Sequence, residues 1–326
     1  MNYKTIIKDA WSLTQQNKNL MWWYAFVPEF IGILVGVFEV IYQVMSFWKS
    51  PVFHEYTGDS FIHEMWNYFM QFWSSHSSLA IVMIILVAVI FLLYLFLPIF
   101  CKAALVQLIA RKRSGQSVKP LDGISFGFLH FLPLFEYRLA IKTFSLMGIF
   151  TLASFVIRNM GADIFKLLLV PFILVLIFGL ALALLLTYSQ YFIIIDGKKV
   201  ISSMGESIHL VVRHWQHTFL MLILMALITL RIFLNIILVL LIPGMIVFST
   251  AALAAFALAK VGFVIGVIAA LVGLYFAAYL GGILEVFSNS VWVFTFLELT
   301  EKAETTARET GEKSSEWVSG QDLDET

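Results

Sequence analysis

Six apolar runs, each about long enough to cross a lipid bilayer, constrain the fold of this 326-residue sequence more than any other feature. A helix needs about 20 apolar residues to cross the hydrocarbon core, and helices satisfy their own backbone hydrogen bonds there. The sequence therefore predicts an all-α, polytopic transmembrane helical bundle of about six spans. The predicted spans are residues 20–46, 79–101, 137–157, 167–195, 218–243 and 265–298.

Composition agrees with a chain that is solvated mostly by lipid. Hydrophobic residues make up 60% of the sequence, charged residues make up 13%, and the mean hydropathy is +0.90. Soluble domains have about 45–50% apolar and about 25% charged residues. The formal net charge of zero gives no reason to expect a nucleic-acid partner, so the expected partner is the lipid bilayer. Cys101 is the single cysteine, which excludes an intrachain disulfide and a cysteine-based metal site.

Basic residues are distributed unequally between the two predicted sides of the bundle. The positive-inside rule assigns the more basic side to the cytoplasm, so both termini are expected there, and an even number of spans agrees. The N-terminus lacks the pattern of a cleavable signal peptide. The more basic side carries Lys4, Lys8, Lys18, Lys102, Arg111, Lys112, Arg113, Lys119, Lys198, Lys199, Arg213, Lys302, Arg308 and Lys313, and the other side carries Lys49, Arg158, Lys166 and Lys260.

The segments between and after the spans complete the predicted organisation. Residues 1–299 are expected to form one integral membrane domain, with an outer amphipathic segment at 47–78 whose aromatic residues recur at helical spacing over 61–73. Residues 244–262 are expected to form a buried or re-entrant connection, or alternatively an extra span. Residues 300–326 are acidic and polar, which predicts a disordered cytoplasmic tail. Such a tail solvates the protein or binds a partner through Trp317 and Val318.

Three segments on the predicted inner side resemble one another. Each reads acidic, small, large apolar, polar, large apolar, and each precedes a span by about eight residues: Asp9–Leu13, Asp122–Phe126 and Glu206–Leu210. The pattern predicts three parallel repeats of an interfacial helix followed by a helical hairpin, related by an axis along the membrane normal.

Residues Tyr188–Leu220 join an aromatic and aliphatic span end, a turn at Asp196-Gly197 and an amphipathic helix that carries serines. This layout resembles the membrane domain attached to some glycerophosphodiester phosphodiesterases and their stand-alone, uncharacterised bacterial relatives. The resemblance implies a protein of the bacterial cytoplasmic membrane. It implies no phosphodiesterase activity, because the chain has no soluble stretch large enough for a catalytic barrel.

Ionisable residues inside spans are costly and often functional, and two of them form the strongest predicted pair. Arg231 and Glu285 each lie 13 residues from the inner end of their span, which is about 20 Å along a helix. Asn235 and Asn289 follow one turn later on the same faces. The pair is interpreted either as a static lock between helices or as part of a route for protons, ions or polar head groups.

Three further charges lie inside the predicted spans. The repeat offset that places Asp9 on Asp122 also places Glu29 on Lys142, so these opposite charges are expected at equivalent depth. Glu39 lies closer to the outer surface. A position near an interface, with the charged head group reaching water, is the alternative for all three.

No recognisable catalytic motif accompanies these charges, and no cofactor or metal is expected. His54, His63 and His76 lack the HExxH spacing of zinc sites, and the P-loop, dinucleotide and Gly-x-Ser-x-Gly patterns are missing. The leading interpretation is a non-enzymatic protein in envelope or lipid handling, or a membrane scaffold for a protein partner or a second copy. A small-molecule, ion or lipid transporter or channel is the alternative, which needs a polar cavity near the midplane. An intramembrane enzyme ranks third.

Overall fold

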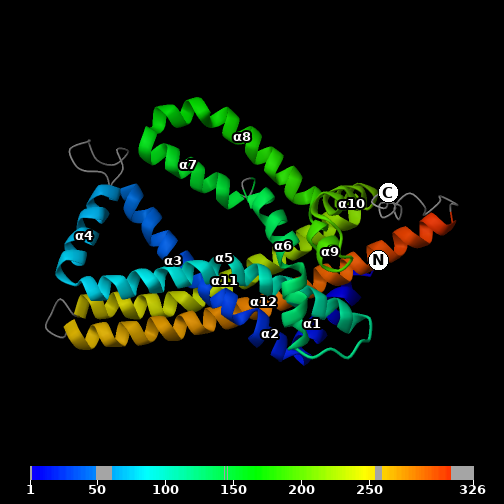
Figure 1. Cartoon of the computed structure of the whole chain (residues 1–326), viewed down its shortest axis with the longest axis horizontal. Helices are drawn as coiled ribbons and strands as arrows, with labels where there is room; N and C mark the ends of the chain where they lie inside the picture. Colours follow the sequence, from blue (N-terminus) through cyan, green and yellow to red (C-terminus); the bar gives the residue numbers. More distant parts are fainter. Residues whose placement is uncertain (1, 49–60, 143, 145, 254–258, 310–326) are drawn as a thin grey trace, which may run out of the picture.

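The computed structural model describes residues 2–48, 61–142, 144, 146–253 and 259–309, and secondary structure in this part of the chain is helical throughout (Figure 1). Six of its helices are long and apolar enough to cross a membrane, so the predicted fold class is confirmed. The helices are α1 (Tyr3–Gln16), α2 (Lys18–Tyr24), α3 (Phe26–Trp48), α4 (Phe61–Ser75), α5 (Ser77–Arg113), α6 (Asp122–Lys142), α7 (Leu146–Met160), α8 (Ala162–Leu185), α9 (Ser189–Ile194), α10 (Val200–Arg213), α11 (Trp215–Leu253) and α12 (Ala259–Glu309).

Burial is concentrated at one end of the molecule, here called the packed end. The core there combines α1, α2 and α9 with residues 99–110 of α5, 286–299 of α12 and the first turns of α11. Helix α1 and the end of α12 lie on this side in Figure 1, whereas the α7–α8 hairpin, α3 and the α11–α12 pair diverge toward the other end. We call that other end the splayed end.

Helix α12 is the central element of the bundle. It packs against α11 along much of its length and also contacts α1, α2, α3 and α5. Small residues on α12 permit this close packing, since Gly273, Ala277 and Gly281 are all buried. The small-residue spacing along this helix therefore serves contacts within the chain, as is usual for such stripes in membrane helices.

The predicted span 137–157 is wrong as a single helix. Helix α6 ends at Lys142, α7 begins at Leu146, and the apolar helical stretch that meets span length in this region is 122–141. The end of α6 and most of α7 are both apolar, so the hydropathy pattern predicted one span across them. Hydropathy gives no signal that one helix ends and another begins there.

Two other predicted spans are interrupted near the packed end. The first divides into α2 and α3 at Ala25, and residues 167–195 divide into α8 and α9. Pro28 accounts for the first break, because its missing N–H and its ring disfavour a helical bond to the carbonyl of Tyr24. At the second break, the Ser207 hydroxyl donates to the carbonyl of Leu185 (2.8 Å) and accepts from the backbone N–H of Tyr188 (3.1 Å).

The predicted re-entrant connection at 244–262 is wrong for its described residues. Helix α11 continues without interruption from Trp215 to Leu253 and α12 begins at Ala259, while residues 254–258 lie outside the described part of the chain. Helix α12 then continues to Glu309, so the first ten residues of the predicted disordered tail are helical. The remainder of that tail, with Trp317 and Val318, lies outside the described residues.

The predicted aromatic helix is present as α4, where the rings of Trp66, Phe69 and Trp73 make tilted contacts along one face, and its outer location stays a prediction. The threefold repeat stays a prediction. Its first and third segments both contain 14-residue helices, α1 and α10, which end in equivalent caps: the N–H of Asn17 bonds to Leu13 and that of His214 to Leu210. Its second segment differs, because α6 begins only at Asp122 and continues to Lys142 without such a break.

Candidate functional site: a charged level at the junction of α3, α5 and α12

Glu29 lies in the first turn of α3, and the break at Ala25 positions it. The first backbone bond of the new helix joins the N–H of Glu29 to the carbonyl of Ala25 (3.1 Å). Pro28 fits this first turn because the N–H groups there have no intrahelical partner to lose. The side chain of Glu29 is half-buried and points toward α12.

Glycine on α12 makes room for this carboxylate. A Cβ atom at Gly281 would lie 2.9 Å from Oε2 of Glu29, so the carboxyl group rests directly against the helix backbone. One turn further along α12 is Glu285, close enough for its charge to act on Glu29. Two helices therefore present acidic side chains to the same region.

Asn289 holds the Glu285 side chain. Its Nδ2 donates to Oε1 of Glu285 (2.8 Å) and to the backbone carbonyl of the same residue (2.8 Å), and Asn289 is buried. The prediction that these two residues share one face of the last span is confirmed. Glu285 itself is half-buried.

Lys102 of α5 is the third ionisable residue in this region. The residue is half-buried overall, but its ammonium group is buried and lies within the electrostatic range of Glu285 and of Arg138 on α6. The sequence interpretation placed Lys102 among basic residues that follow a span. It lies inside α5 instead, 11 residues before that helix ends at Arg113. Glu29, Lys102 and Glu285 together are called the charged level below.

Arg231 does not pair with Glu285, which corrects the strongest sequence prediction. Among the described residues no salt bridge joins the two, and both Arg231 and Asn235 are exposed on the outward face of α11. Equal counting from the span ends carried no information on which face of α11 meets α12. Glu285 is bonded to Asn289 instead.

The other predicted charges are placed as follows. Glu39 is half-buried on α3, ten residues beyond Glu29 toward the splayed end. Lys142 is the last residue of α6, and its side chain lies outside the described part of the structure. The Glu29–Lys142 pair therefore stays a prediction.

A polar network lies on the packed side of the charged level. The Gln107 side-chain amide donates to the carbonyl of Ile194 and lies 3.3 Å from Nε2 of His130, which joins α5, α9 and α6. Burial, followed by the negative charge of Glu285, raises the pKa of Tyr191 well above its usual value. Tyr191 therefore stays a neutral phenol at physiological pH.

Arg158 is a buried charge that the sequence interpretation assigned to the outer loop. It is only 7% exposed on α7, its Nε donates to the carbonyl of Ser154 (3.2 Å), and its guanidinium lies 5.3 Å from the ring of Tyr42 on α3. Cation–π contacts of this kind stabilise an arginine away from water. Nothing in the local sequence separates it from an exposed loop arginine.

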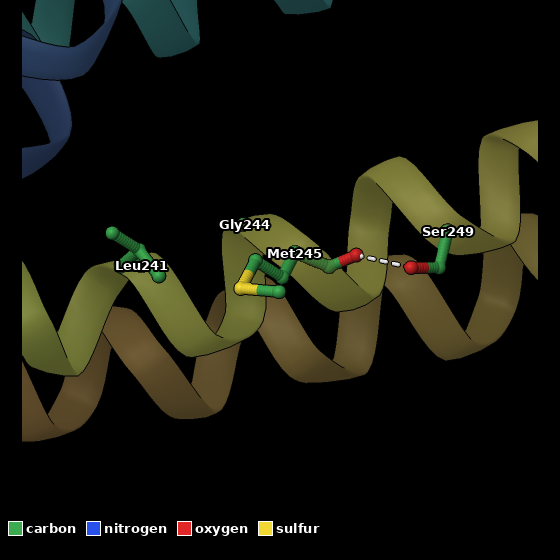
Figure 2. Close-up of a pocket in the computed structure, with 4 residues that line it drawn as sticks. All are labelled: Leu241, Gly244, Met245 and Ser249. Atoms are coloured by element: carbon green, nitrogen blue, oxygen red, sulfur yellow. Dashed lines mark hydrogen bonds between the residues drawn. The ribbon is translucent and has the colours of Figure 1, made fainter.

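A pocket on α11 offers little chemistry. Leu241, Gly244, Met245 and Ser249 line it, and the Ser249 hydroxyl is bonded to the carbonyl of Met245 on the same helix at 2.8 Å (Figure 2). Across the described residues, moreover, no three His, Cys, Asp or Glu side chains gather as metal ligands would. The charged level is therefore the best candidate for a functional site, and its carboxylates and ammonium group suit the binding of an ion or the transfer of a proton.

Comparison with known proteins adds no assignment, since no family model, no curated protein and no solved structure matches this chain.

Proposed function

We propose that this chain is a non-enzymatic, multi-pass membrane protein that acts through its packed end as a scaffold for a protein partner in envelope or lipid handling. The observation that supports this most is the uneven burial of the six candidate spans. In the most apolar 18-residue stretch, 33% of residues are buried in α12 but only 6% in α3, α5 and α8. Helices so exposed to lipid anchor the protein and do not build a wall around a solute path.

The packed end has the rigidity that a binding platform needs. Arg113 at the end of α5 forms an ion pair with Asp9 of α1 (3.0 Å). The hydroxyl of Tyr24 in α2 donates to the carbonyl of Pro120, just before α6 (2.5 Å). These bonds join segments about 100 residues apart in the chain, so the short helices form one unit with the ends of the spans.

The packed end also exposes apolar side chains on helices that are not spans. Ile201 on α10 is 86% exposed, and Val212 on the same helix is 61% exposed. Exposed apolar patches on a rigid surface are typical of protein or membrane contacts. We also propose that the packed end faces the cytoplasm, because the basic residues in the last turns of α5 and α10 lie at this end. The layout resemblance to stand-alone relatives of phosphodiesterase membrane domains is compatible with such a role.

A transporter of ions or small molecules is the second candidate, and the charged level is what favours it. Glu29 and Glu285 approach each other in the bundle, and within the described part of the chain no salt bridge connects either of them to Lys102. Carboxylates that are close but not locked by a cation are able to exchange a proton or a bound cation.

Site-specific photocrosslinking in cells tests the scaffold. A photoreactive phenylalanine analogue replaces Ile201 on the packed end, and the matched control replaces Val82, which is 63% exposed on α5 in the splayed half. We expect a discrete protein adduct at position 201 and lipid adducts at position 82. Equal protein adducts at both positions, or lipid adducts alone at both, would contradict a partner that binds the packed end.

A further inference from the structure

The three residues of the charged level, and Arg231 on α11, lie about 28–39 Å from the splayed ends of their four helices. At about 1.5 Å per residue, Glu29 is about 28 Å from the end of α3, and Lys102 is about 38 Å from the start of α5. Arg231 is about 33 Å from the end of α11, and Glu285 is about 39 Å from the start of α12. The hydrocarbon core of a bilayer is about 30 Å thick, and helices that tilt by up to about 40° accommodate the longer segments.

Exposure changes at the same level on α5. Toward the splayed end, from Leu79 to Phe96, most large apolar side chains are exposed. Toward the packed end, residues 103–110 are all buried by other parts of the chain. A bilayer centred on the charged level would leave the first turns of α5 in water, with their leucine, isoleucine and valine side chains unprotected. Apolar side chains left in water are unfavourable, because removing apolar surface from water stabilises a protein.

We propose that the charged level marks the edge of the hydrocarbon core on the packed side, and that Arg231 binds phosphate groups of the phospholipids in that leaflet. This inference goes beyond the scaffold proposal, since it fixes the bilayer on the molecule and names a ligand class. It also means that Glu29, Lys102 and Glu285 lie between helices at the depth of the lipid head groups, while the core of the packed end lies outside the hydrocarbon.

Charge complementarity supports phosphate as the partner of Arg231. Its guanidinium is exposed, and the neighbouring Asn235 is exposed one turn away. The face of α11 that carries them also carries Leu234, Leu238 and Ile242, which are 52–63% exposed and suit acyl chains. An arginine above a row of apolar side chains matches a phospholipid, because guanidinium binds phosphate through two parallel hydrogen bonds.

Spin-label depth measurements test the position of the bilayer. In a Cys101→Ala background, nitroxides are attached one at a time at residues 234, 242 and 272, and the protein is reconstituted in vesicles of phosphatidylglycerol and phosphatidylethanolamine. Residue 242 is the midpoint between Arg231 and the splayed end of α11, and residue 272 is the midpoint between Glu285 and the splayed end of α12. The relaxation of each spin label by oxygen is compared with its relaxation by a water-soluble nickel chelate. We expect the labels at residues 242 and 272 to lie deep in the hydrocarbon core and the label at residue 234 to lie near its edge. A label at 234 that is deeper than one at 242 would overturn the proposal.

A lipid titration tests Arg231 itself. Phosphatidylglycerol is added to the full chain in maltoside detergent, and the melting temperature is compared for wild type, Arg231→Lys and Arg231→Gln. A ligand that binds only the folded state raises the melting temperature, so we expect Arg231→Gln to retain at most about half of the wild-type gain and Arg231→Lys to retain most of it. Equal gains for all three would contradict phosphate binding. An immobile label at 234, shielded from both relaxing agents, would show that a second copy covers this face and would also overturn the assignment.

Discussion

The carboxylate of Glu29 on α3 rests against the bare backbone of Gly281 on α12, where a Cβ atom would approach Oε2 to 2.9 Å. This contact explains how a charged side chain is accommodated between two tightly packed helices, and it identifies the glycine that the contact requires.

Gly281→Ala should therefore displace the Glu29 side chain and destabilise the protein, by about 1 kcal/mol at the lower end of overpacking costs. Gly36→Ala in α3 is the matched control, because nothing lies within 4 Å of a Cβ there. Thermal unfolding in detergent measures both. The double variant Gly281→Ala with Glu29→Ala should recover most of the lost stability. If the double variant is as unstable as Gly281→Ala alone, the destabilisation does not come from contact with Glu29.

The changes in unfolding free energy caused by Arg231→Ala and Glu285→Ala should add in the double variant. Their side chains form no ion pair in the described structure, and independent sites usually add within about 0.5 kcal/mol. A double-mutant cycle on unfolding free energies provides the measurement. A coupling of several kcal/mol would restore the predicted lock between α11 and α12.

Ser207→Ala should destabilise the junction of α8, α9 and α10. The hydroxyl satisfies both the carbonyl of Leu185 and the N–H of Tyr188, and a buried backbone group that loses its partner costs about 1–3 kcal/mol. Ser202→Ala is the control on the same helix, because Ser202 is exposed and makes only a 3.5 Å contact with Glu206. Similar melting temperatures for the two variants would show that Ser207 has no such role.

Stability should fall in mild acid through His214. Burial, followed by the charge of Arg213, lowers the pKa of His214, and His217, Lys302 and His209 add to the effect. The folded state therefore binds this proton less well than the unfolded state, so stability is complete above the ordinary histidine pKa of about 6.5 and is lost as the pH falls below it. His214→Gln should flatten the melting temperature between pH 7.5 and 5.5, and an unchanged slope would assign the acid sensitivity to other groups.

The sequence was sufficient to predict the helical membrane class because length and hydropathy alone determine it. It missed the helix breaks at Ala25 and at 186–188, which are caused by contacts or local geometry that hydropathy does not record, and it did not separate α6 from α7. Pro28 was a visible signal for the first of these breaks. Ser207, which acts 22 residues away from Leu185, gave no signal that could have been recognised.

The candidate site was predicted in part. Glu29, Glu285 and Asn289 were identified because charged or polar residues in apolar helices are conspicuous. Lys102 was placed after the second span because the apolar run ends before it, although α5 continues to Arg113. The rotation of each helix about its axis depends on all its neighbours, so the outward direction of Arg231 could not be predicted from its depth.

The most direct test of the scaffold account asks whether water from the splayed side reaches the charged level. Ser288→Cys, one turn from Glu285, is made in a Cys101→Ala background and exposed to a membrane-impermeant charged thiol reagent in vesicles of both orientations. Ser114→Cys, at the packed end, is the accessible control. The account predicts that Ser288→Cys is never modified from the splayed side, with or without an imposed proton gradient. Modification from that side would reveal a water-filled path through the bundle and would favour the transporter.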